Sequence, residues 1–547
     1  MTQLHLRLCH GEWQSHEDNG TCFQQKGQIF VDQSPRTIGQ VAQCVQESAT
    51  AHALKASLNQ FNGFYAWVEQ SPGFIRAAVD HIRSLPLFYA CVNGHFHLSD
   101  DAEWVRQKAG DREMDPVSRQ EFQLAGYVTG ADTLFPHVKQ LQAGEFLVAE
   151  DRRGGVHVQP HRYCRFLHAE PEQVDTTALL KELDGIAIAS ITRLIAHADG
   201  RQIVVPLSGG YDSRLIVTLL KRLGYENVCS FSYGLPGNKE ATYSKRVADA
   251  LGLRWHFVKY NDERWREAWA GNDRKTYQQR AAGWTSIPHV QDWLAVKCLK
   301  EQNVLEPDCV FAPGHGGDFV AGSHIPKQAR RGAPATLSQL TEATFSNHYR
   351  LARFQVAPKP DKAFWANRIL DRAERWLIED GVTLADAMEK WDWQERQAKF
   401  ICNSVRVYEF YGYDWWMPLW DVEFMRFWEH VPLELRKGTA LYLAYVRQET
   451  HKQDSTGTLS QLTNASDPGL LTKMAVWTNA VSSPWILNYA RSVRRVLSRA
   501  LGNDPRRAFP GGIHILNRDA AKHAWGVNGM LAYAFLKDFD DSVRCIK

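Results

Sequence analysis

The sequence has few of the features that mark several classes of protein. Its 64 Lys and Arg against 61 Asp and Glu leave a net charge of only +3, which argues against a nucleic-acid binder held by phosphate contacts. No uninterrupted apolar run reaches the roughly 18 residues that span a bilayer, and the first residues lack the basic-then-apolar pattern of a signal peptide. The ten cysteines are scattered singly, without a C-x-x-C pair. We therefore expect reduced thiols, a cytoplasmic location and no zinc site.

The chain is long enough for more than one hydrophobic core. At 547 residues it predicts two or three domains, and its 44% hydrophobic content is typical of a soluble globular protein. The 19 tryptophans are a high number, and many lie between Trp391 and Trp428. We expect an aromatic core there.

A glycine-rich turn that follows an apolar stretch is the most informative part of the sequence. Residues 203–207 predict a buried parallel strand, and the apolar spacing of residues 214–223 predicts a helix. The turn between them reads Ser208-Gly209-Gly210-Tyr211-Asp212-Ser213. Its unshielded backbone N–H groups, its serine hydroxyls and the helix N-terminus predict an anion site. Because a carboxylate repels an anion, Asp212 predicts a Mg²⁺ ion between itself and a polyphosphate.

This turn is not the Walker P-loop, since the chain has no G-x-x-x-x-G-K-[ST] sequence. It resembles the pyrophosphate-binding loop of the ATP pyrophosphatases. These enzymes cleave ATP between the α- and β-phosphates and leave AMP on a substrate. The resemblance implies ATP as the polyphosphate.

Strands and helices alternate around this turn. Residues 175–198 predict a helix before it, and the strand at 228–233, the helix at 242–251 and the strand at 255–258 follow it. This alternation predicts a doubly wound parallel sheet, in which ligands bind at the carboxyl ends of the strands. Further along, residues 391–413 predict another long helix.

About 100 residues after the first turn, a second apolar stretch runs into glycines and an acid. It reads Val310-Phe311-Ala312-Pro313-Gly314-His315-Gly316-Gly317-Asp318-Phe319. It resembles the Gly-Glu-Gly-Ser-Asp-Glu loop of the glutamine-dependent asparagine synthetases, which faces the first loop. The resemblance implies that Gly314 approaches the nucleotide and that Asp318 is the second Mg²⁺ ligand beside Asp212.

The same resemblance implies further site residues. The residues implied to bind ATP and pyrophosphate are Leu207, Ser208, Gly209, Gly210, Asp212, Ser213, Tyr233 and Gly314. His315 stands where the family has a Glu, a position that the β-lactam synthetases also change. It is a candidate catalytic residue that accepts a proton from an attacking amine, because histidine titrates near neutral pH, or it only shapes the pocket. The family's late catalytic lysine is not assigned among Lys437, Lys452 and Lys473.

Residues 1–165 contain short strands, such as 27–31, 63–68 and 74–79. The segments Gly63-Phe64-Tyr65-Ala66 and Gly126-Tyr127-Val128-Thr129-Gly130 resemble the glutaminase domain of the asparagine synthetases, an N-terminal-nucleophile (Ntn) αββα sandwich. The family's nucleophile is a Cys directly after the initiator Met, whereas this chain has Thr2. The Arg-Gly-Pro-Asp and Asn-Gly-Glu substrate segments are also missing. We expect a degenerate scaffold, with Thr2 as the alternative nucleophile.

The sequence thus predicts an α/β protein of three parts. These are a degenerate glutaminase-like domain at 1–165, an asparagine-synthetase-like ATP-pyrophosphatase domain at 175–460 and a helical C-terminal extension at 461–547. The predicted activity is ATP- and Mg²⁺-dependent amide formation. A small-molecule carboxylate is adenylated, pyrophosphate leaves, and an amine or ammonia takes the acyl group. We expect glutamine not to be the nitrogen donor, and the amine to be larger than ammonia.

Several alternatives stay open. Within the enzymes they are an intramolecular lactam or peptide cyclase and a sugar uronic acid amidotransferase of surface-polysaccharide synthesis. The chain could also be a homologue without catalytic activity. The intact site residues argue against this, namely Ser208, Asp212, Ser213 and Asp318. A homodimer is also left open, while no nucleic-acid or membrane partner is expected.

Overall fold

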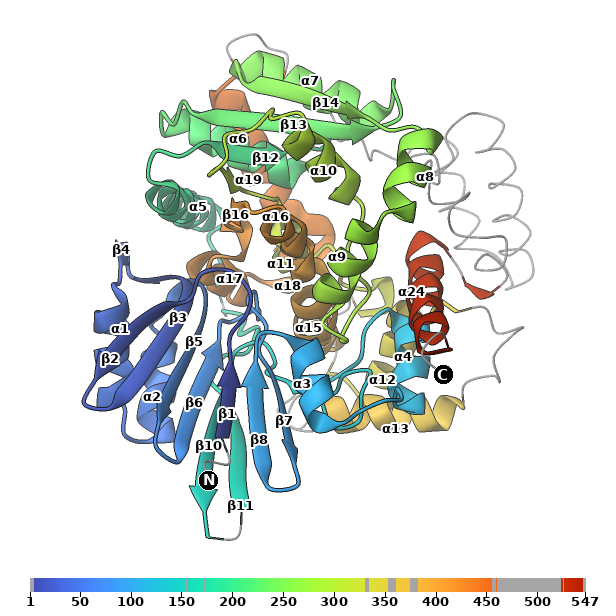
Figure 1. Ribbon diagram of the computed structural model, residues 1–547. Coiled ribbons are helices and arrows are strands. Elements are labelled where there is room, and N and C mark those ends of the chain that lie inside the picture. The colour runs from blue at the N-terminus through green and yellow to red at the C-terminus, as the bar shows by residue number, and fades with distance from the viewer. Residues whose placement is uncertain are drawn as a thin grey trace.

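Figure 1 shows the computed structural model of the protein, coloured from blue at the N-terminus to red at the C-terminus. The structure describes residues 4–153, 155–171, 173–329, 334–352, 361–373, 382–454, 459, 523–524 and 526–544. Among these residues, no helix is both long and apolar enough to cross a membrane.

Two β-sheets form the N-terminal part of the molecule. The first has the strand order β1-β8-β7-β9, and the second has the order β11-β10-β6-β5-β3-β2, with β4 paired to β3. The strands are β1 (Leu4–Arg7), β2 (Gln14–Asp18), β3 (Thr21–Val31), β4 (Ser34–Pro35), β5 (Asn62–Ser71), β6 (Phe74–Val79), β7 (Phe88–Val92), β8 (His95–Ser99), β9 (Lys139–Gln140), β10 (Glu145–Arg152) and β11 (Gly155–Arg162). The strands predicted at 27–31, 63–68 and 74–79 are confirmed as parts of β3, β5 and β6.

Helices cover these sheets. They are α1 (Ile38–Glu47), α2 (Ala51–Leu58), α3 (Ala102–Ala109) and α4 (Pro116–Ala125). Helix α1 contacts β2 and β3 of one sheet, α3 contacts β7 and β8 of the other, and β11 contacts β8 across the two sheets. The helices begin where the sequence supplies caps: the Thr37 side chain accepts a hydrogen bond from the backbone of Gln40 in a capping box, and Asp101 and Asp115 cap α3 and α4. The arrangement is the αββα sandwich expected from the sequence.

A third sheet organises the second half of the chain. Its five strands are all parallel, in the order β14-β13-β12-β15-β16. They are β12 (Ile203–Pro206), β13 (Val228–Gly234), β14 (Arg254–Lys259), β15 (Val310–Phe311) and β16 (Asp414–Trp415). Ile203, Val204 and Val205 are fully buried because β12 lies in the centre of the sheet. The doubly wound parallel sheet predicted from the βα alternation is therefore present.

Helices connect and surround these strands (Figure 1). Those before β15 are α5 (Thr176–Ala198), α6 (Tyr211–Arg222), α7 (Lys239–Leu251), α8 (Asp262–Ala270), α9 (Asn272–Ala282) and α10 (Trp293–Glu301). Those after it are α11 (Gly317–Val320), α12 (Leu337–His348), α13 (Lys362–Arg372), α15 (Leu384–Trp391), α16 (Arg406–Phe410), α17 (Val422–Glu429), α18 (Leu433–Arg436), α19 (Ala440–Lys452) and α24 (Gly526–Arg544). Short 3₁₀ turns lie at Lys327–Ala329, Pro418–Trp420 and Lys437–Thr439.

The long helix predicted over 391–413 is not one regular α-helix. The chain runs as a π-helix over Asp392–Ile401, a 3₁₀ turn over Cys402–Val405 and then α16. A buried ion pair lies inside the π-helical stretch: Lys399 Nζ contacts Glu395 Oε2 at 2.5 Å and donates to the carbonyls of Val128 and Gly130. The apolar spacing predicted a helical stretch, but it does not distinguish a π-helix or a 3₁₀ turn from an α-helix.

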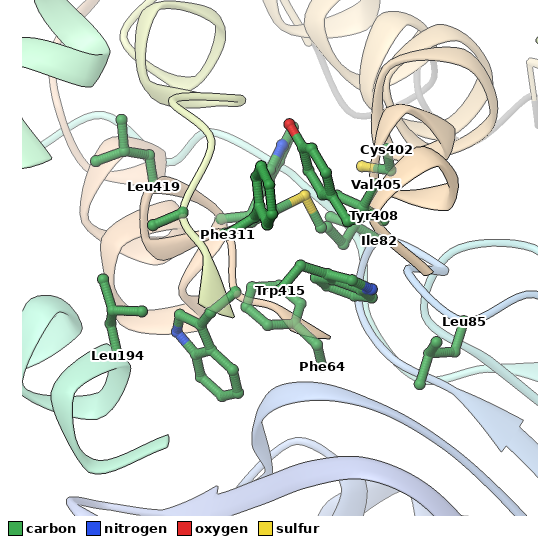
Figure 2. Packing of buried hydrophobic residues seen from close by; sticks show 14 of the residues in the cluster. Phe64, Ile82, Leu85, Leu194, Phe311, Cys402, Val405, Tyr408, Trp415 and Leu419 are labelled. Carbon is green, nitrogen blue, oxygen red and sulfur yellow. The ribbon is translucent and has the colours of Figure 1, made fainter. Parts of the chain in front are cut away.

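The two halves of the chain share one core. Figure 2 shows Phe64, Ile82 and Leu85 of the N-terminal part facing Trp415, Tyr408 and Val405 of the second half. The ring centroid of Phe64 lies 5.6 Å from that of Trp415 and 4.7 Å from that of Trp416. This aromatic packing holds the N-terminal sheets against the parallel sheet.

Asp421 adds a polar contact at the same junction. Its carboxylate accepts hydrogen bonds from Arg193 Nε at 2.6 Å and from Asn62 Nδ2 at 3.1 Å, and all three side chains are buried. Removal of Arg193 would take away the cation that the buried Asp421 carboxylate pairs with. At the other end of the chain, α24 lies beside α4, where Asp540 pairs with Arg119 at 2.6 Å.

Candidate active site

Both glycine-rich turns follow strands that lie side by side in the parallel sheet. β12 pairs with β15 in parallel, with Val204 opposite Phe311. The turn at 208–213 follows β12, and the turn at 312–317 follows β15. Because parallel strands end at one edge of their sheet, the two turns meet there, as the sequence predicted.

The first turn is held by its own serines. The Ser208 backbone N–H donates to Ser213 Oγ at 3.1 Å, and Gly210 N–H donates to Ser208 Oγ at 3.1 Å. Helix α6 begins directly after Gly210, and no side chain caps its N-terminus. Its first N–H groups therefore remain available to an anion, and the positive end of the helix dipole points at the turn.

Gly314 brings the second turn into contact with the first. A Cβ atom at this position would lie 2.9 Å from Asp212 Cβ and 2.9 Å from the Ser213 backbone N. Any side chain would force the two turns apart, since such a separation is shorter than real Cβ atoms allow. Gly314 is thus a point of close approach between the two loops.

Asp212 and Asp318 face the same space. Asp318 is exposed and its carboxylate accepts a hydrogen bond from Ser323 Oγ at 2.9 Å. Burial and the nearby Asp318 carboxylate raise the pKa of Asp212 to about 8. Hydrogen bonds from Tyr442 and from the Asp318 backbone act in the opposite direction, but their effect is smaller. The groups that act on Asp212 among the described residues include no basic side chain. Carboxylate oxygens are the ligands that a hard divalent cation such as Mg²⁺ prefers, and such a cation would offset the repulsion between Asp212 and Asp318.

His315 belongs to the second turn, and its ring contacts two residues from other parts of the chain. Its Nε2 is 2.6 Å from Ser404 Oγ, and its ring centroid is 6.3 Å from that of His289. Burial, helped by His289, lowers the pKa of His315 to about 4. The imidazole is therefore neutral at pH 7.

The remaining predicted residues lie at or near the same edge. Leu207 is buried, its N–H donates to the Phe231 carbonyl and its carbonyl accepts from Ser232 Oγ, so it joins the first turn to β13. Gly209 is buried within the first turn. Tyr233, near the end of β13, is partly exposed and stacks on Tyr260 with centroids 5.2 Å apart. This places an aromatic ring on the strand next to β12.

The ion pairs of the candidate lysines do not connect them to the two turns. Lys437 pairs with Glu434 and Lys452 with Glu449, each three residues away, and neither pair includes a residue of the two turns. Lys473 and Thr2 lie outside the described residues, as does most of the predicted extension at 461–547. The identity of a catalytic lysine therefore stays a prediction.

Two further residues were missed by the sequence analysis. Tyr442 of α19 donates a hydrogen bond from its hydroxyl to Asp212 Oδ1 at 2.7 Å, and Ser404 contacts His315. They lie 230 and 89 residues away from their partners in the sequence. No local motif marks either, and only the packing of α19 against α6 brings Tyr442 to the turn.

The class of fold is therefore α/β, with an αββα sandwich and a parallel sheet that carries paired glycine-rich turns. Residues 195–448, somewhat less than half of the chain, match the model of the asparagine synthase family. The match covers both turns and Tyr442. The class of activity that it indicates is that of an ATP-using, amide-forming ligase.

No curated protein sequence matches the chain, and the two solved structures described next resemble it only distantly. One similar structure is the glutamine phosphoribosylpyrophosphate amidotransferase from B. subtilis complexed with ADP and GMP, at 12% identity and a TM-score of 0.20, covering 46% of this chain and 73% of that one. Another is the NH3-dependent NAD synthetase from Campylobacter jejuni in complex with the nitrate ion, at 14% identity and a TM-score of 0.21, covering 40% and 93%. These scores are too low to carry an argument.

The hydrogen bond from Tyr442 gives a test of the carboxylate site. In Tyr442→Phe, Asp212 loses the donor that favours its ionised form, so we expect the Mg²⁺ concentration for half-maximal activity to rise about tenfold, the usual worth of a hydrogen bond to a charged group. Tyr445→Phe is the matched control, because Tyr445 lies one turn further along α19 and donates to Asp184 instead. An equal rise in both variants would contradict the assignment.

Proposed function

We propose that the protein is an ATP-dependent amide-forming ligase of the asparagine synthetase type. It adenylates a small-molecule carboxylate with release of pyrophosphate and transfers the acyl group to an amine or ammonia. ATP and Mg²⁺ are the proposed cofactors. The observation that carries the proposal is the contact of Gly314 with Asp212 and Ser213, because it joins the two turns into one site.

The first half-reaction uses the first turn. A carboxylate oxygen of the substrate attacks the α-phosphorus of ATP, and the bond to the β-phosphate oxygen breaks. The uncapped N–H groups of α6 and the hydroxyls of Ser208 and Ser213 bind the departing pyrophosphate and stabilise its developing charge. Asp212 and Asp318 are the residues that would hold Mg²⁺, which neutralises phosphate charge when bound.

The second half-reaction forms the amide. The amine nitrogen attacks the carbonyl carbon of the acyl-adenylate, AMP leaves with the bridging oxygen, and the amine loses a proton. Burial lowers the pKa of His315 to about 4, so the ring is neutral at pH 7 but is a weaker base than the histidine titrating near neutral pH that we expected from the sequence. In the proposal it takes the proton after attack on the acyl-adenylate has made the amine nitrogen acidic, with its ring held by the contact with Ser404. A neutral imidazole in place of an ionised carboxylate favours an amine that is larger and less charged than ammonium.

The N-terminal part has a different proposed role. We assign residues 1–165 to a degenerate glutaminase-like domain, 175–460 to the synthetase domain and 461–547 to a C-terminal extension. The aromatic junction around Phe64 and Trp415 supports a scaffold role for the first domain, since it buries the N-terminal sheet against the strand next to β15.

His315→Ala is expected to separate the two half-reactions. ATP–pyrophosphate exchange should persist, while amide formation should slow by about 10²-fold, the low end for loss of a general base. The exposed His52→Ala is the control. Equal losses in both half-reactions would place His315 in the ATP site, and unchanged rates would leave it as a pocket wall.

The function itself is tested by the products of ATP. Purified protein is screened with Mg²⁺, ATP and a panel of carboxylates and amines, and pyrophosphate, phosphate, AMP and ADP are measured. We expect AMP and pyrophosphate with a productive pair. Release of ADP and phosphate instead would refute the proposal.

A further inference from the structure

A histidine and two acids meet in the interior, outside the two glycine-rich turns. His168 lies in the segment between β11 and α5, and Asp386 and Glu389 lie three residues apart on α15. One ring nitrogen of the histidine and one oxygen of each carboxylate all lie within 4.8 Å of one another. We call these three residues the linker cluster, because His168 belongs to the segment that links the N-terminal part to the second half of the chain.

The His168 ring is enclosed but has no hydrogen bond. Its side chain is 0% exposed, and neither ring nitrogen has a hydrogen-bond partner among the described residues. Nδ1 lies 3.3 Å from Asp386 Oδ1, and Nε2 lies 3.8 Å from Glu389 Oε2. The ring therefore turns its polar edge toward both acids. Buried polar groups are nearly always hydrogen-bonded, so an imidazole in this position indicates a partner of another kind.

One arginine serves three carboxylates at this point. Arg436 of α18 donates hydrogen bonds to Glu389 Oε2 and, at 3.1 Å, to Asp386 Oδ1, and it also lies 3.4 Å from Glu170 Oε1. Within the described part of the chain, no other lysine or arginine pairs with these three acids. Three carboxylates against one guanidinium leave two formal negative charges. The second carboxylate oxygen of Glu389, Oε1, has no hydrogen-bond partner among the described residues.

The electrostatic surroundings of Glu389 agree with this imbalance. Burial raises the pKa of Glu389 to about 8 although Arg436 acts in the opposite direction, and Asp386 raises it further. His168 supplies no compensating charge, because burial and the nearby Arg436 hold its pKa well below its usual range. A neutral imidazole has a free lone pair, which is the form that binds metal ions.

We propose that the linker cluster binds a divalent transition-metal ion, Zn²⁺ or Mn²⁺, through one ring nitrogen of His168 and carboxylate oxygens of Asp386 and Glu389. Such ions accept mixed imidazole and carboxylate ligands, whereas Mg²⁺ prefers oxygen ligands. A charge of +2 balances the two negative charges that Arg436 leaves. The cluster contains no cysteine, so the lack of a C-x-x-C pair does not bear on it.

The separations in the cluster suit such an ion. At bond lengths of about 2.0–2.2 Å, neighbouring ligand atoms around tetrahedral Zn²⁺ lie about 3.3–3.6 Å apart. The separations of 3.3 and 3.8 Å from His168 are close to these values, so small side-chain movements complete the site. Arg436 remains as a hydrogen-bond partner of the two carboxylates, and metal-ligating carboxylates usually have such partners.

The metal ion would fasten the linking segment to the helices of the second half. This segment already contacts them, because the Ala169 N–H donates to the Glu429 carbonyl at 2.7 Å and Glu170 Oε1 accepts from the Leu433 N–H at 2.7 Å. Figure 1 shows α15, α17 and α18 between the N-terminal sheets and the parallel sheet. An ion that binds only the folded chain stabilises it by mass action, so the proposed role is structural.

The test counts metal on the full chain, without ATP. Protein stripped with EDTA and desalted is titrated with Zn²⁺, Mn²⁺ or Mg²⁺ by calorimetry, and the metal retained after dialysis is measured by mass spectrometry. We expect the unmodified protein to hold one Zn²⁺ or Mn²⁺ more per chain than His168→Gln. Affinity at this site should fall by at least about 10²-fold in the variant, since loss of even a partner of a ligand costs about 10–100-fold. Glu389→Gln should have the same effect.

Two controls assign the ion to the cluster. His348→Gln replaces another buried histidine, which is hydrogen-bonded to Tyr127, and should keep the ion. Asp212→Ala should keep it too, which separates the cluster from the Mg²⁺ site proposed at the turns. Retention of all bound Zn²⁺ and Mn²⁺ by both His168→Gln and Glu389→Gln would overturn the proposal, as would the absence of either ion from the unmodified protein or tighter binding of Mg²⁺ at the cluster.

Unfolding temperatures distinguish a lost ligand from a damaged fold. With EDTA present, the unmodified protein and His168→Gln should unfold at nearly the same temperature, because neither holds the ion. Added Zn²⁺ or Mn²⁺ should raise the unfolding temperature of the unmodified protein only. An equal rise in His168→Gln and Glu389→Gln would contradict the proposal. The readout needs no turnover, so its failure is distinct from failure of the proposed ligase activity.

Discussion

Asp212→Ala is expected to abolish ATP-dependent pyrophosphate release, with a loss of at least about 10³-fold. Removal of one of two carboxylates that would hold Mg²⁺ should cost several kcal/mol of transition-state stabilisation, and each 1.4 kcal/mol is about tenfold in rate. The measurement is pyrophosphate release with the productive substrate pair over a range of Mg²⁺ concentrations. Saturating Mg²⁺ should not restore the rate.

The fold should survive this substitution. Burial and Asp318 raise the pKa of Asp212, so its ionised form opposes folding at neutral pH, and alanine removes that penalty. We expect an unfolding temperature no lower than that of the unmodified protein. Asp249→Ala is the control, because Asp249 is an exposed acid on α7 that pairs with Lys245. Full activity in Asp212→Ala would refute the role of this carboxylate.

Gly314→Ala is expected to lower activity by about 10²-fold, since small displacements of reacting groups have effects of this size. The added methyl group would lie 2.9 Å from both Asp212 Cβ and the Ser213 backbone N, and a backbone atom cannot move aside as a flexible side chain can. The two turns must therefore separate. The rate of ATP–pyrophosphate exchange measures the effect directly on the first half-reaction.

Gly185→Ala provides the matched control for Gly314→Ala. Gly185 lies within α5, and a Cβ atom there would meet nothing within 4 Å. Alanine should leave activity unchanged and stabilise the helix by about 0.5–1 kcal/mol. Activity of Gly314→Ala within twofold of this control would show that the close approach of the turns is not needed.

The sequence by itself determined the parts of the site that depend on local chemistry. The buried strand at 203–206, the turn from Ser208 to Ser213 and the helix after it follow from apolar spacing and two glycines, and the structure contains all three. The second turn could be matched to the first because both end an apolar strand with glycines and an acid. The family resemblance implied that the two turns face each other, and the parallel pairing of β12 with β15 places them at one edge of the sheet.

The tertiary structure alone decided how these parts act on each other. Tyr442 reaches Asp212 from α19, and Ser404 reaches His315, across separations that no periodicity spans. Apolar spacing predicted a helix over 391–413, but only the structure shows that Asp392–Ile401 is π-helical and that it buries the pair of Lys399 and Glu395. The sequence shows that a histidine is present, but only the structure shows that burial and the neighbouring His289 lower the pKa of His315 to about 4. Local patterns record which groups are present, whereas desolvation and long-range packing set their charge and their partners.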